Sequence, residues 1–142
     1  MIEIVEAPIE IQKIIASVQD PAAGGIDVFI GTTRNNARGK QVVELEYEAY
    51  VPMALAEMNK IATDIRDRWS VIHSSFVHRI GIVHVGEASV VVAVSSAHRS
   101  EAFEACRYAI DTLKKTVPIW KKERFIDGEV WVGLAGKEQK HI

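Results

Sequence analysis

Four lysines surround a proline and a tryptophan in the segment LKKTVPIWKKERF, which covers residues 113–125. The lysines form two pairs, Lys114 with Lys115 and Lys121 with Lys122. A lysine that lies close to other cations, or that is partly desolvated, has its pKa lowered from about 10.4. Such an amine can act as an acid, a base or a nucleophile. The segment therefore indicates either a solvated helix end that runs into a turn or a site for a negatively charged ligand.

The two pairs differ in how well an ordinary explanation fits them. Lys114 and Lys115 fall in the last turn of a predicted helix, where cations complement the negative end of the helix dipole. Lys121 and Lys122 come after Pro118, so the dipole explanation does not extend to them. The pattern alone does not decide whether the two pairs converge in space.

Two other cationic spots are candidates for anion binding. His98 and Arg99 stand between a predicted strand and the start of a predicted helix. A helix N-terminus exposes unpaired N–H groups that favour anions, and arginine adds a planar fork suited to phosphate or carboxylate. The alternative is a polar loop in which the arginine pairs with a nearby glutamate. Arg34 and Arg38 lie in the polar loop 33–40, and each alone is uninformative because loop arginines are usually solvated.

The remaining chemistry-bearing residues predict no metal site, no cofactor and no reactive thiol. His73, His78 and His84 lack the paired ligand spacing of a zinc centre. His73 and His78 are an odd number of residues apart, which places them on opposite sides of a regular strand. Cys106 falls on the apolar stripe of a predicted helix, so we expect a buried structural thiol. A single cysteine also excludes an internal disulfide.

The elements that must position these residues follow from the hydrophobic pattern. Apolar residues at helical spacing predict helices over 9–19, 52–69 and 100–115. Runs rich in β-branched and aromatic residues predict strands over 26–33, 42–50, 71–87, 88–97 and 128–133. Some strands follow each other directly, although others alternate with helices. The pattern therefore predicts an α+β or mixed α/β fold, with helices packed on a mixed, largely antiparallel sheet.

Local features refine these elements. Ser100 is a plausible N-cap for the last helix. The segment 71–87 forms either one long strand or two strands broken at Gly81. The strand 42–50 alternates, with the apolar residues from Val43 to Ala49 on one face and glutamates on the other. The strand 88–97 is apolar on both faces, which predicts a central position in the sheet.

Length and composition fit one globular domain over residues 1–142. With 142 residues, of which 48% are hydrophobic and 25% charged, the chain can bury a core and is neither disordered nor fibrous. A formal net charge of −2 gives no support to a nucleic-acid binder, so any anion site must be local. The longest apolar run, Ser89–Val94, is too short to span a bilayer, and the acidic N-terminal segment is unlike a signal peptide. We therefore expect a cytoplasmic protein without membrane association.

Several segments in combination resemble one known family. GTTRNNARGK, LEYEAYVPMA, RIGIVHVGEASVVVAVSSAHRSEAFEACRYAIDTLKKTVPIWKKE and WVG occur in this order, from about Ile26 to Gly133. Together they resemble the large, catalytic subunit of molybdopterin synthase. The resemblance implies an α/β-hammerhead fold with extra strands. It also implies conversion of cyclic pyranopterin monophosphate (precursor Z) to molybdopterin by addition of two sulfurs.

The resemblance implies partners as well. In this family the sulfur arrives as a thiocarboxylate on the C-terminal Gly-Gly tail of a small ubiquitin-like subunit, which threads into a pocket of the large subunit. The large subunits form a central homodimer within a heterotetramer. The chain ends in KEQKHI rather than in two glycines, and Cys106 is expected to be buried. We therefore expect the sulfur to come from the partner.

The resemblance also implies roles for individual residues. The catalytic lysines of the family fall on Lys114 and Lys121, whereas Arg34, His98 and Arg99 would hold the phosphate and the pterin. The neighbouring Lys115 and Lys122 are further substrate-binding candidates, because a shift of one residue in the assignment is possible.

Two rival functions use the same residues. One is a non-catalytic homodimeric module that binds a phosphorylated metabolite and reports it to a partner. The other is a lyase or aldolase that forms a Schiff base on lysine, although nothing in the sequence specifically demands it. Product formation separates the first from the enzyme, and borohydride trapping would reveal the second.

Overall fold

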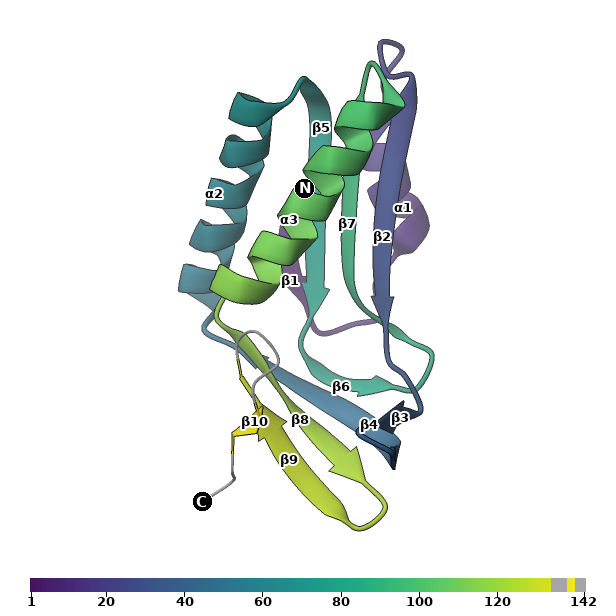
Figure 1. Ribbon diagram of the computed structural model, residues 1–142, viewed down its shortest axis with the longest axis vertical. Coiled ribbons are helices and arrows are strands. Elements are labelled where there is room, and N and C mark those ends of the chain that lie inside the picture. Colours follow the sequence, from purple (N-terminus) through teal and green to yellow (C-terminus); the bar gives the residue numbers. More distant parts are fainter. Residues whose placement is uncertain (134–137, 140–142) are drawn as a thin grey trace.

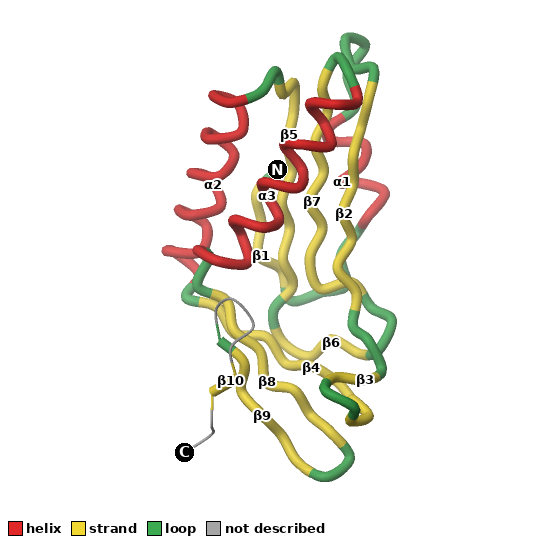
Figure 2. The backbone as a smooth tube through the Cα atoms, viewed as in Figure 1, coloured by secondary structure: helices red, strands yellow, loops and turns green. Residues whose placement is uncertain are grey.

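The structure, a computed structural model, describes residues 1–133 and 138–139, which form two β-sheets and three helices (Figure 1). In chain order the elements are β1 (Ile2–Val5), α1 (Ile11–Val18), β2 (Gly25–Thr32), β3 (Asn36–Ala37), β4 (Lys40–Ala49), α2 (Val51–Arg68), β5 (Val71–Arg79), β6 (Gly81–His84), β7 (Ala88–Ser96), α3 (Arg99–Thr116), β8 (Ile119–Phe125), β9 (Gly128–Val132) and β10 (Glu138–Gln139). The first sheet carries the helices, and the second sheet lies below it in the view of Figure 2. The predicted α+β fold is confirmed.

The first sheet has the strand order β1-β5-β7-β2, in which β1 and β5 are parallel and the other pairs are antiparallel. Helices α2 and α3 cover one face, and α1 covers the other (Figure 1). Strand β7 is buried on both sides, because Val90, Val92 and Val94 join the core under α2 and α3 while Val91 and Ala93 join the core under α1. The prediction of a central strand here is confirmed.

Helix α3 connects the first sheet to the second (Figure 1). It begins at Arg99 with His98 as the N-cap residue, so the prediction of Ser100 as the N-cap is wrong. The reason is that the chain is still extended at His98, with φ −127° and ψ 144°, and turns into the helix directly after it. Lys114 and Lys115 lie in the last turn, as predicted.

In the part of the chain that the structure describes, the second sheet has the order β10-β9-β8-β4-β3, and β6 also pairs with β4. Gly81, at φ 86°, is the first residue of β6 and follows the end of β5 after Ile80 alone, and the two strands belong to different sheets. A positive φ is readily adopted by glycine, and of the two alternatives for the segment 71–87 the structure shows the one with two strands. Strand β8 was not predicted; it pairs antiparallel with β4 and β9.

The predicted face of the strand 42–50 needs one correction. A β-bulge between Val42 and Glu44 shifts the register, so that Val42 is 4% exposed and Val43 is 49% exposed. An extra residue in one strand reverses the inward and outward sides beyond it. Val43 therefore does not share the buried face that holds Leu45.

None of the helices within the described ranges has the length and hydropathy to cross a bilayer.

Candidate active site

A pocket of about 100 Å³ lies where the end of α3 meets the second sheet. The lining residues are Tyr47, His78, Leu113, Lys114, Val117, Ile119, Trp120, Lys121, Val132 and Gly133. Helix α3 contributes Lys114 and strand β8 contributes Lys121, so the first lysine of each pair reaches the same pocket. The two lysine-rich segments thus converge in space, which the sequence pattern alone did not decide.

The turn at Pro118 determines how the two lysines approach each other. Val117 is extended, with φ −79° and ψ 124°, as expected for the residue before a proline. The carbonyl of Pro118 accepts a hydrogen bond from the N–H of Tyr50 at 3.1 Å, and β8 then continues along β4 with Lys121 opposite Tyr47. The proline therefore converts the helix end into a paired strand within a few residues.

The alternation of β8 decides which of its lysines enters the pocket. Lys121 and Glu123 share one face, and their nearest charged atoms are 3.8 Å apart. Lys122 points to the opposite face, where its Nζ lies 3.7 Å from Glu129 and 4.6 Å from the centroid of the Trp131 ring. Lys122 is therefore held on the outer side of the sheet, away from the pocket.

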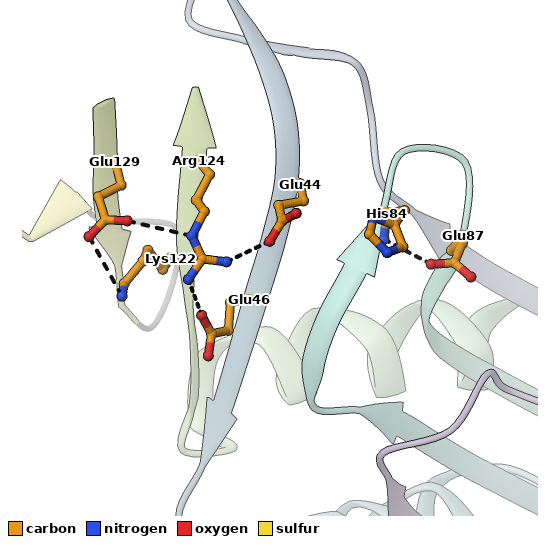
Figure 3. Close-up of polar contacts among 7 residues, drawn as sticks. All are labelled: Glu44, Glu46, His84, Glu87, Lys122, Arg124 and Glu129. Carbon is orange, nitrogen blue, oxygen red and sulfur yellow. Dashed lines mark hydrogen bonds and ion pairs between the residues drawn. The ribbon is translucent and has the colours of Figure 1, made fainter. Parts of the chain in front are cut away.

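The outer side carries a continuous charge network (Figure 3). Arg124 donates to Glu44 at 2.6 Å and to Glu46, and its Nε lies 3.5 Å from Glu129. Glu129 in turn contacts Lys122. Because these acidic groups surround Arg124 and Lys122, the network ties β4, β8 and β9 together and gives no concentrated positive charge on that side.

Burial and neighbouring charge lower the pKa of both pocket lysines. For Lys114, desolvation is the larger cause and the positive charge of Lys121 adds to it. For Lys121, desolvation again lowers the pKa, Glu123 opposes the change, and the charges of Arg34 and Arg38 lower it further. Arg34 thus lies close enough to act on Lys121. A lysine with a lowered pKa is suited to proton transfer near neutral pH.

Glu123 provides the buried negative charge beside these cations. It is 5% exposed, and it accepts a hydrogen bond from Nη2 of Arg38. Arg38 and Gly39 form the two-residue loop between β3 and β4, with φ values of 52° and 77°. Positive φ at both loop residues is the geometry of a type I′ hairpin turn. This tight turn places Arg38 against Glu123, so the carboxylate contacts both Arg38 and Lys121.

Tyr47 and His78 are aromatic residues of the pocket lining whose place there the sequence did not reveal. The rings of Tyr47 and His78 form an edge-to-face contact with centroids 5.0 Å apart. Burial lowers the pKa of His78 to about 4, and the positive charge of Lys114 also lowers it. The hydrogen bond to the Arg79 carbonyl raises the pKa and so opposes these two effects. The predicted opposite orientation of His73 and His78 is confirmed, because they pair with Ser95 and Val90 of β7 in a register without a bulge between the two positions. The odd spacing of the two histidines was the feature of the sequence that indicated that one of them faces inward.

Four other predicted site residues do not line this pocket within one chain, namely Arg34, His98, Arg99 and Lys115. His98 and Arg99 are exposed at the start of α3, whereas Lys114 lies in its last turn. A helix of 18 residues is about 27 Å long at 1.5 Å per residue, so the two ends are far apart. Lys115 is exposed and does not line the pocket.

Cys106 behaves as the sequence predicted. It is 2% exposed, its thiol donates to the Val92 carbonyl at 3.7 Å, and burial raises its pKa to about 12. A thiol with a raised pKa holds little thiolate at neutral pH and is unreactive. Within the described ranges, no cluster of His, Cys, Asp and Glu side chains is arranged to hold a metal ion.

Comparisons with known proteins agree with the resemblance. The family model described as "MoaE protein" matches residues 4–116. The molybdopterin synthase catalytic subunit of Homo sapiens is 52% identical over 125 residues, which are 88% of this chain and 66% of the human protein. The corresponding Bacillus subtilis subunit is 49% identical over 131 residues, which are 92% of this chain and 83% of that protein. The chain thus spans just under two thirds of the human relative's length.

Solved structures share the fold. The crystal structure of molybdopterin synthase from Staphylococcus aureus superposes with a TM-score of 0.88 at 41% identity, covering 92% of this chain and 96% of that one. A complex of subunits 1 and 2 of the molybdopterin-converting factor from Helicobacter pylori has a TM-score of 0.76 at 21% identity, covering 99% of this chain and 92% of that one, a likeness of fold alone. The chain therefore belongs to the MoaE family of molybdopterin synthase catalytic subunits.

Proposed function

We propose that this chain converts precursor Z to molybdopterin with sulfur from the C-terminal thiocarboxylate of a small ubiquitin-like subunit. The supporting observation is the pocket that holds Lys114 and Lys121, with Arg34 and Arg38 close enough to act on Lys121. A cyclic phosphate and a thiocarboxylate are both anions, so a recess that concentrates positive charge in a chain of net charge −2 suits both. Membership of the MoaE family supports the same reaction.

The two lysines are the proposed catalytic residues. They bind the carboxyl end of the donor tail and relay protons while the thiocarboxylate sulfur forms a bond to a substrate carbon. They also stabilise the oxyanion that develops when water then cleaves the bond between the acyl carbon and sulfur, which leaves the sulfur on the substrate and a carboxylate on the tail. Lys121 is half-buried and Lys114 remains exposed, and partial desolvation, which lowers the pKa of both, strengthens their interaction with a developing negative charge. Arg34 is the proposed ligand of the substrate phosphate.

We also propose that a second copy of the chain completes the site. Strand β2 is an edge of the first sheet, and Ile26, Phe29 and Ile30 on it are 38–40% exposed. An edge strand with apolar side chains is suited to pairing with another copy about a twofold axis. Antiparallel pairing would bring Gly25 of one copy beside Thr32 of the other.

This pairing would carry the remaining predicted residues to the pocket. Gly25 packs against Arg99, since a Cβ on Gly25 would lie 3.0 Å from the Arg99 Cα. Arg34 follows closely after Thr32 at the other end of β2. The partner copy would therefore place its His98 and Arg99 near Arg34, as required for a shared phosphate site.

The small subunit is proposed as a partner in a heterotetramer, and the reaction predicts a cytoplasmic location. The pocket is small, with a volume of about 100 Å³, so an extended chain end fits it better than a folded segment. A Gly-Gly terminus lacks side chains and is the thinnest peptide end available. The proposed entry of the donor tail therefore agrees with the size of the pocket.

Reconstitution tests the proposal. The chain is mixed with a thiocarboxylated ubiquitin-like subunit and precursor Z, and molybdopterin is measured. We expect Lys114→Ala and Lys121→Ala to abolish product while Lys115→Ala and Lys122→Ala retain most of it, because only the first lysine of each pair lines the pocket. Near-normal turnover by both Lys114→Ala and Lys121→Ala would refute the assignment.

The same experiment separates the enzyme from the alternative of a non-catalytic module. A module that only binds a phosphorylated metabolite would form a complex with precursor Z and would make no product with a thiocarboxylated partner. Gel filtration or light scattering of Ile30→Lys tests the proposed pairing, since a charge on the β2 edge should convert dimers to monomers.

A further inference from the structure

The loop that carries Arg34 is fixed by backbone hydrogen bonds on both sides of this residue. Before it, the N–H of Thr33 donates to the Glu87 carbonyl at 3.1 Å, and the Thr33 carbonyl accepts from the N–H of Gly86 at 2.9 Å. After it, the Asn35 carbonyl accepts a backbone N–H from β4 at 2.9 Å. Thr33 is 4% exposed, whereas Arg34 is exposed. The place of Arg34 therefore depends on the turn that holds Thr33.

That turn, the β6–β7 turn of residues 84–87, joins the second sheet to the first and is closed twice. The N–H of Glu87 donates to the His84 carbonyl at 3.0 Å, and Gly86 has φ 86°, as in turns that require glycine at the third position. In addition, carboxylate Oε1 of Glu87 accepts from the N–H of His84 at 2.9 Å (Figure 3). Glu87 thus uses its carbonyl to hold the Arg34 loop and its carboxylate to hold the turn itself.

The Glu87 carboxylate also contacts a buried guanidinium. Arg79, the last residue of β5, is 8% exposed, and its Nη1 lies 3.4 Å from Oε2 of Glu87. Among the described residues, Glu87 is the acidic group that contacts Arg79. The hydrogen bond from His84 and then the charge of Arg79 lower the pKa of the Glu87 carboxyl. Burying a charge is costly unless it is paired, so the buried arginine favours the one orientation of Glu87 that pairs with it.

Arg79 is itself held in place by the first sheet. It lies opposite Val5 of β1 in the parallel ladder, and its carbonyl accepts a hydrogen bond from Nδ1 of His78 at 2.8 Å. A side chain on a strand of a packed sheet is placed more precisely than one on a loop. Arg79 can therefore act as a fixed reference for the mobile side chain of Glu87 and for the turn behind it.

We propose that Arg79 is a positioning residue for Arg34. Its guanidinium holds the carboxylate of Glu87, Glu87 holds the β6–β7 turn, and the turn holds Thr33. Arg34 is thereby kept beside the pocket, where its charge acts on Lys121. The contacts belong to the free chain, and the inference rests on the proposed function only for the role of Arg34 as the ligand of the substrate phosphate.

Amide hydrogen exchange of the chain alone, measured by nuclear magnetic resonance, tests the anchor without reference to activity. We expect the Thr33 and Gly86 amides to exchange about tenfold faster in Glu87→Ala and in Arg79→Met, as for loss of one hydrogen bond to a charged group. The amide of Val92, in the central strand β7, should stay within about threefold, since it exchanges through opening of the whole fold.

Two results of the exchange experiment would overturn the proposal. An equal rise at all three amides would show a pair that only stabilises the fold, and wild-type exchange at Thr33 in Arg79→Met would show that Glu87 closes the turn without Arg79. If Arg79→Met does not fold, Glu87→Gln decides, because it keeps an oxygen for the His84 N–H and removes the charge that faces Arg79. We then expect faster exchange at Thr33, and wild-type exchange would again overturn the proposal.

A matched control breaks an ion pair that has no contact with this turn. Glu10 pairs with Lys13 at 3.2 Å on α1, on the other face of the first sheet, and both side chains are exposed. Glu10→Ala should therefore leave the exchange of Thr33 and Gly86 unchanged. Faster exchange of these two amides in the control would show that they respond to any loss of surface charge, and would refute the assignment to Arg79.

A kinetic double-mutant cycle tests the consequence for the reaction. With the thiocarboxylated small subunit and precursor Z, we expect Arg79→Met to raise KM for precursor Z about tenfold and to leave kcat within about threefold, as for loss of binding to the phosphate. In an Arg34→Ala chain the same change should add less than about twofold, because the residue that Arg79 positions is already absent.

An equal loss in the wild-type and the Arg34→Ala backgrounds would contradict the positioning role, and so would a loss confined to kcat. Failure of the wild-type chain to make molybdopterin would refute the proposed function and would leave the exchange measurement intact. The two failures are therefore distinguishable.

Discussion

Replacing Glu123 by glutamine should destabilise the fold by about 2 kcal/mol, because it removes the buried charge between Arg38 and Lys121. The Glu123 side chain is 6% exposed, and Lys121 Nζ lies 3.8 Å from it. At an effective dielectric constant of 20 the attraction at this distance is about 4 kcal/mol before desolvation is subtracted. The side chains of Lys121 and Arg38 are 31% and 45% exposed, so water screens more than half of that attraction.

A double-mutant cycle isolates the contribution of one pair. We expect Glu123→Gln and Arg38→Gln to show a coupling energy of about 1–2 kcal/mol in urea unfolding, consistent with a hydrogen bond between two charged groups. The loss of about 2 kcal/mol in Glu123→Gln corresponds to a fall in Tm of about 6–10 °C for a chain of this length.

A neighbouring ion pair serves as the control cycle. Lys40 and Asp127 are 3.9 Å apart with side chains that are 56% and 69% exposed, so their coupling should stay below about 0.5 kcal/mol. If the coupling between Glu123 and Arg38 is no larger than that of the control, the carboxylate does not hold Arg38, and the account of how the hairpin is placed beside the pocket is wrong.

Three further predictions concern burial. Between the lowered pKa of Lys114 and the ordinary value of 10.5, the folded chain holds fewer protons on Lys114 than the unfolded chain does. The free energy of unfolding should therefore rise with pH in this range, and it should rise less steeply in Lys114→Met. Urea unfolding at several pH values measures both slopes, and equal slopes in the two proteins would contradict the lowered pKa. Ile65→Ala, at a residue that is 0% exposed on the inner face of α2, should cost about 2–5 kcal/mol in urea unfolding, and a cost below about 1 kcal/mol would mean that the core is not packed there. Cys106 should react with a thiol reagent at least about 100-fold more slowly in the native chain than in urea, since its pKa rises to about 12; comparable rates would show an accessible thiol.

The sequence was sufficient for the elements whose burial follows a simple period. The strand around Val91 is apolar on both faces, and its place between two layers of helices follows directly from that pattern. Gly81 indicated a possible break between β5 and β6, since it is the residue type that readily takes a positive φ, but the pattern left a single long strand as the alternative. Strand β8 was missed since its residues IWKKERF are mostly charged, and only pairing with β4 shows that they form a strand.

The same limit applies to the site. The sequence placed Lys114 and Lys121 among the candidates, but the choice within each pair depends on the phase of α3 and on the alternation of β8. His78 and Glu123 lie beside groups that are distant in sequence, such as Lys114 and Arg38. Their environment is created by tertiary packing, and no local pattern contains it.

The unpaired edge of β2 has a consequence for work with the isolated chain. Its open backbone groups and its exposed side chains Ile26 and Ile30 form a template on which other strands can add, which is the usual start of aggregation. In the proposed dimer, dilution or a truncation that separates the copies would leave that edge uncovered. A monomeric preparation for spectroscopy therefore needs lysine substitutions on β2, whose charges oppose the addition of further strands. These lysines should be introduced together with any change that keeps the copies apart.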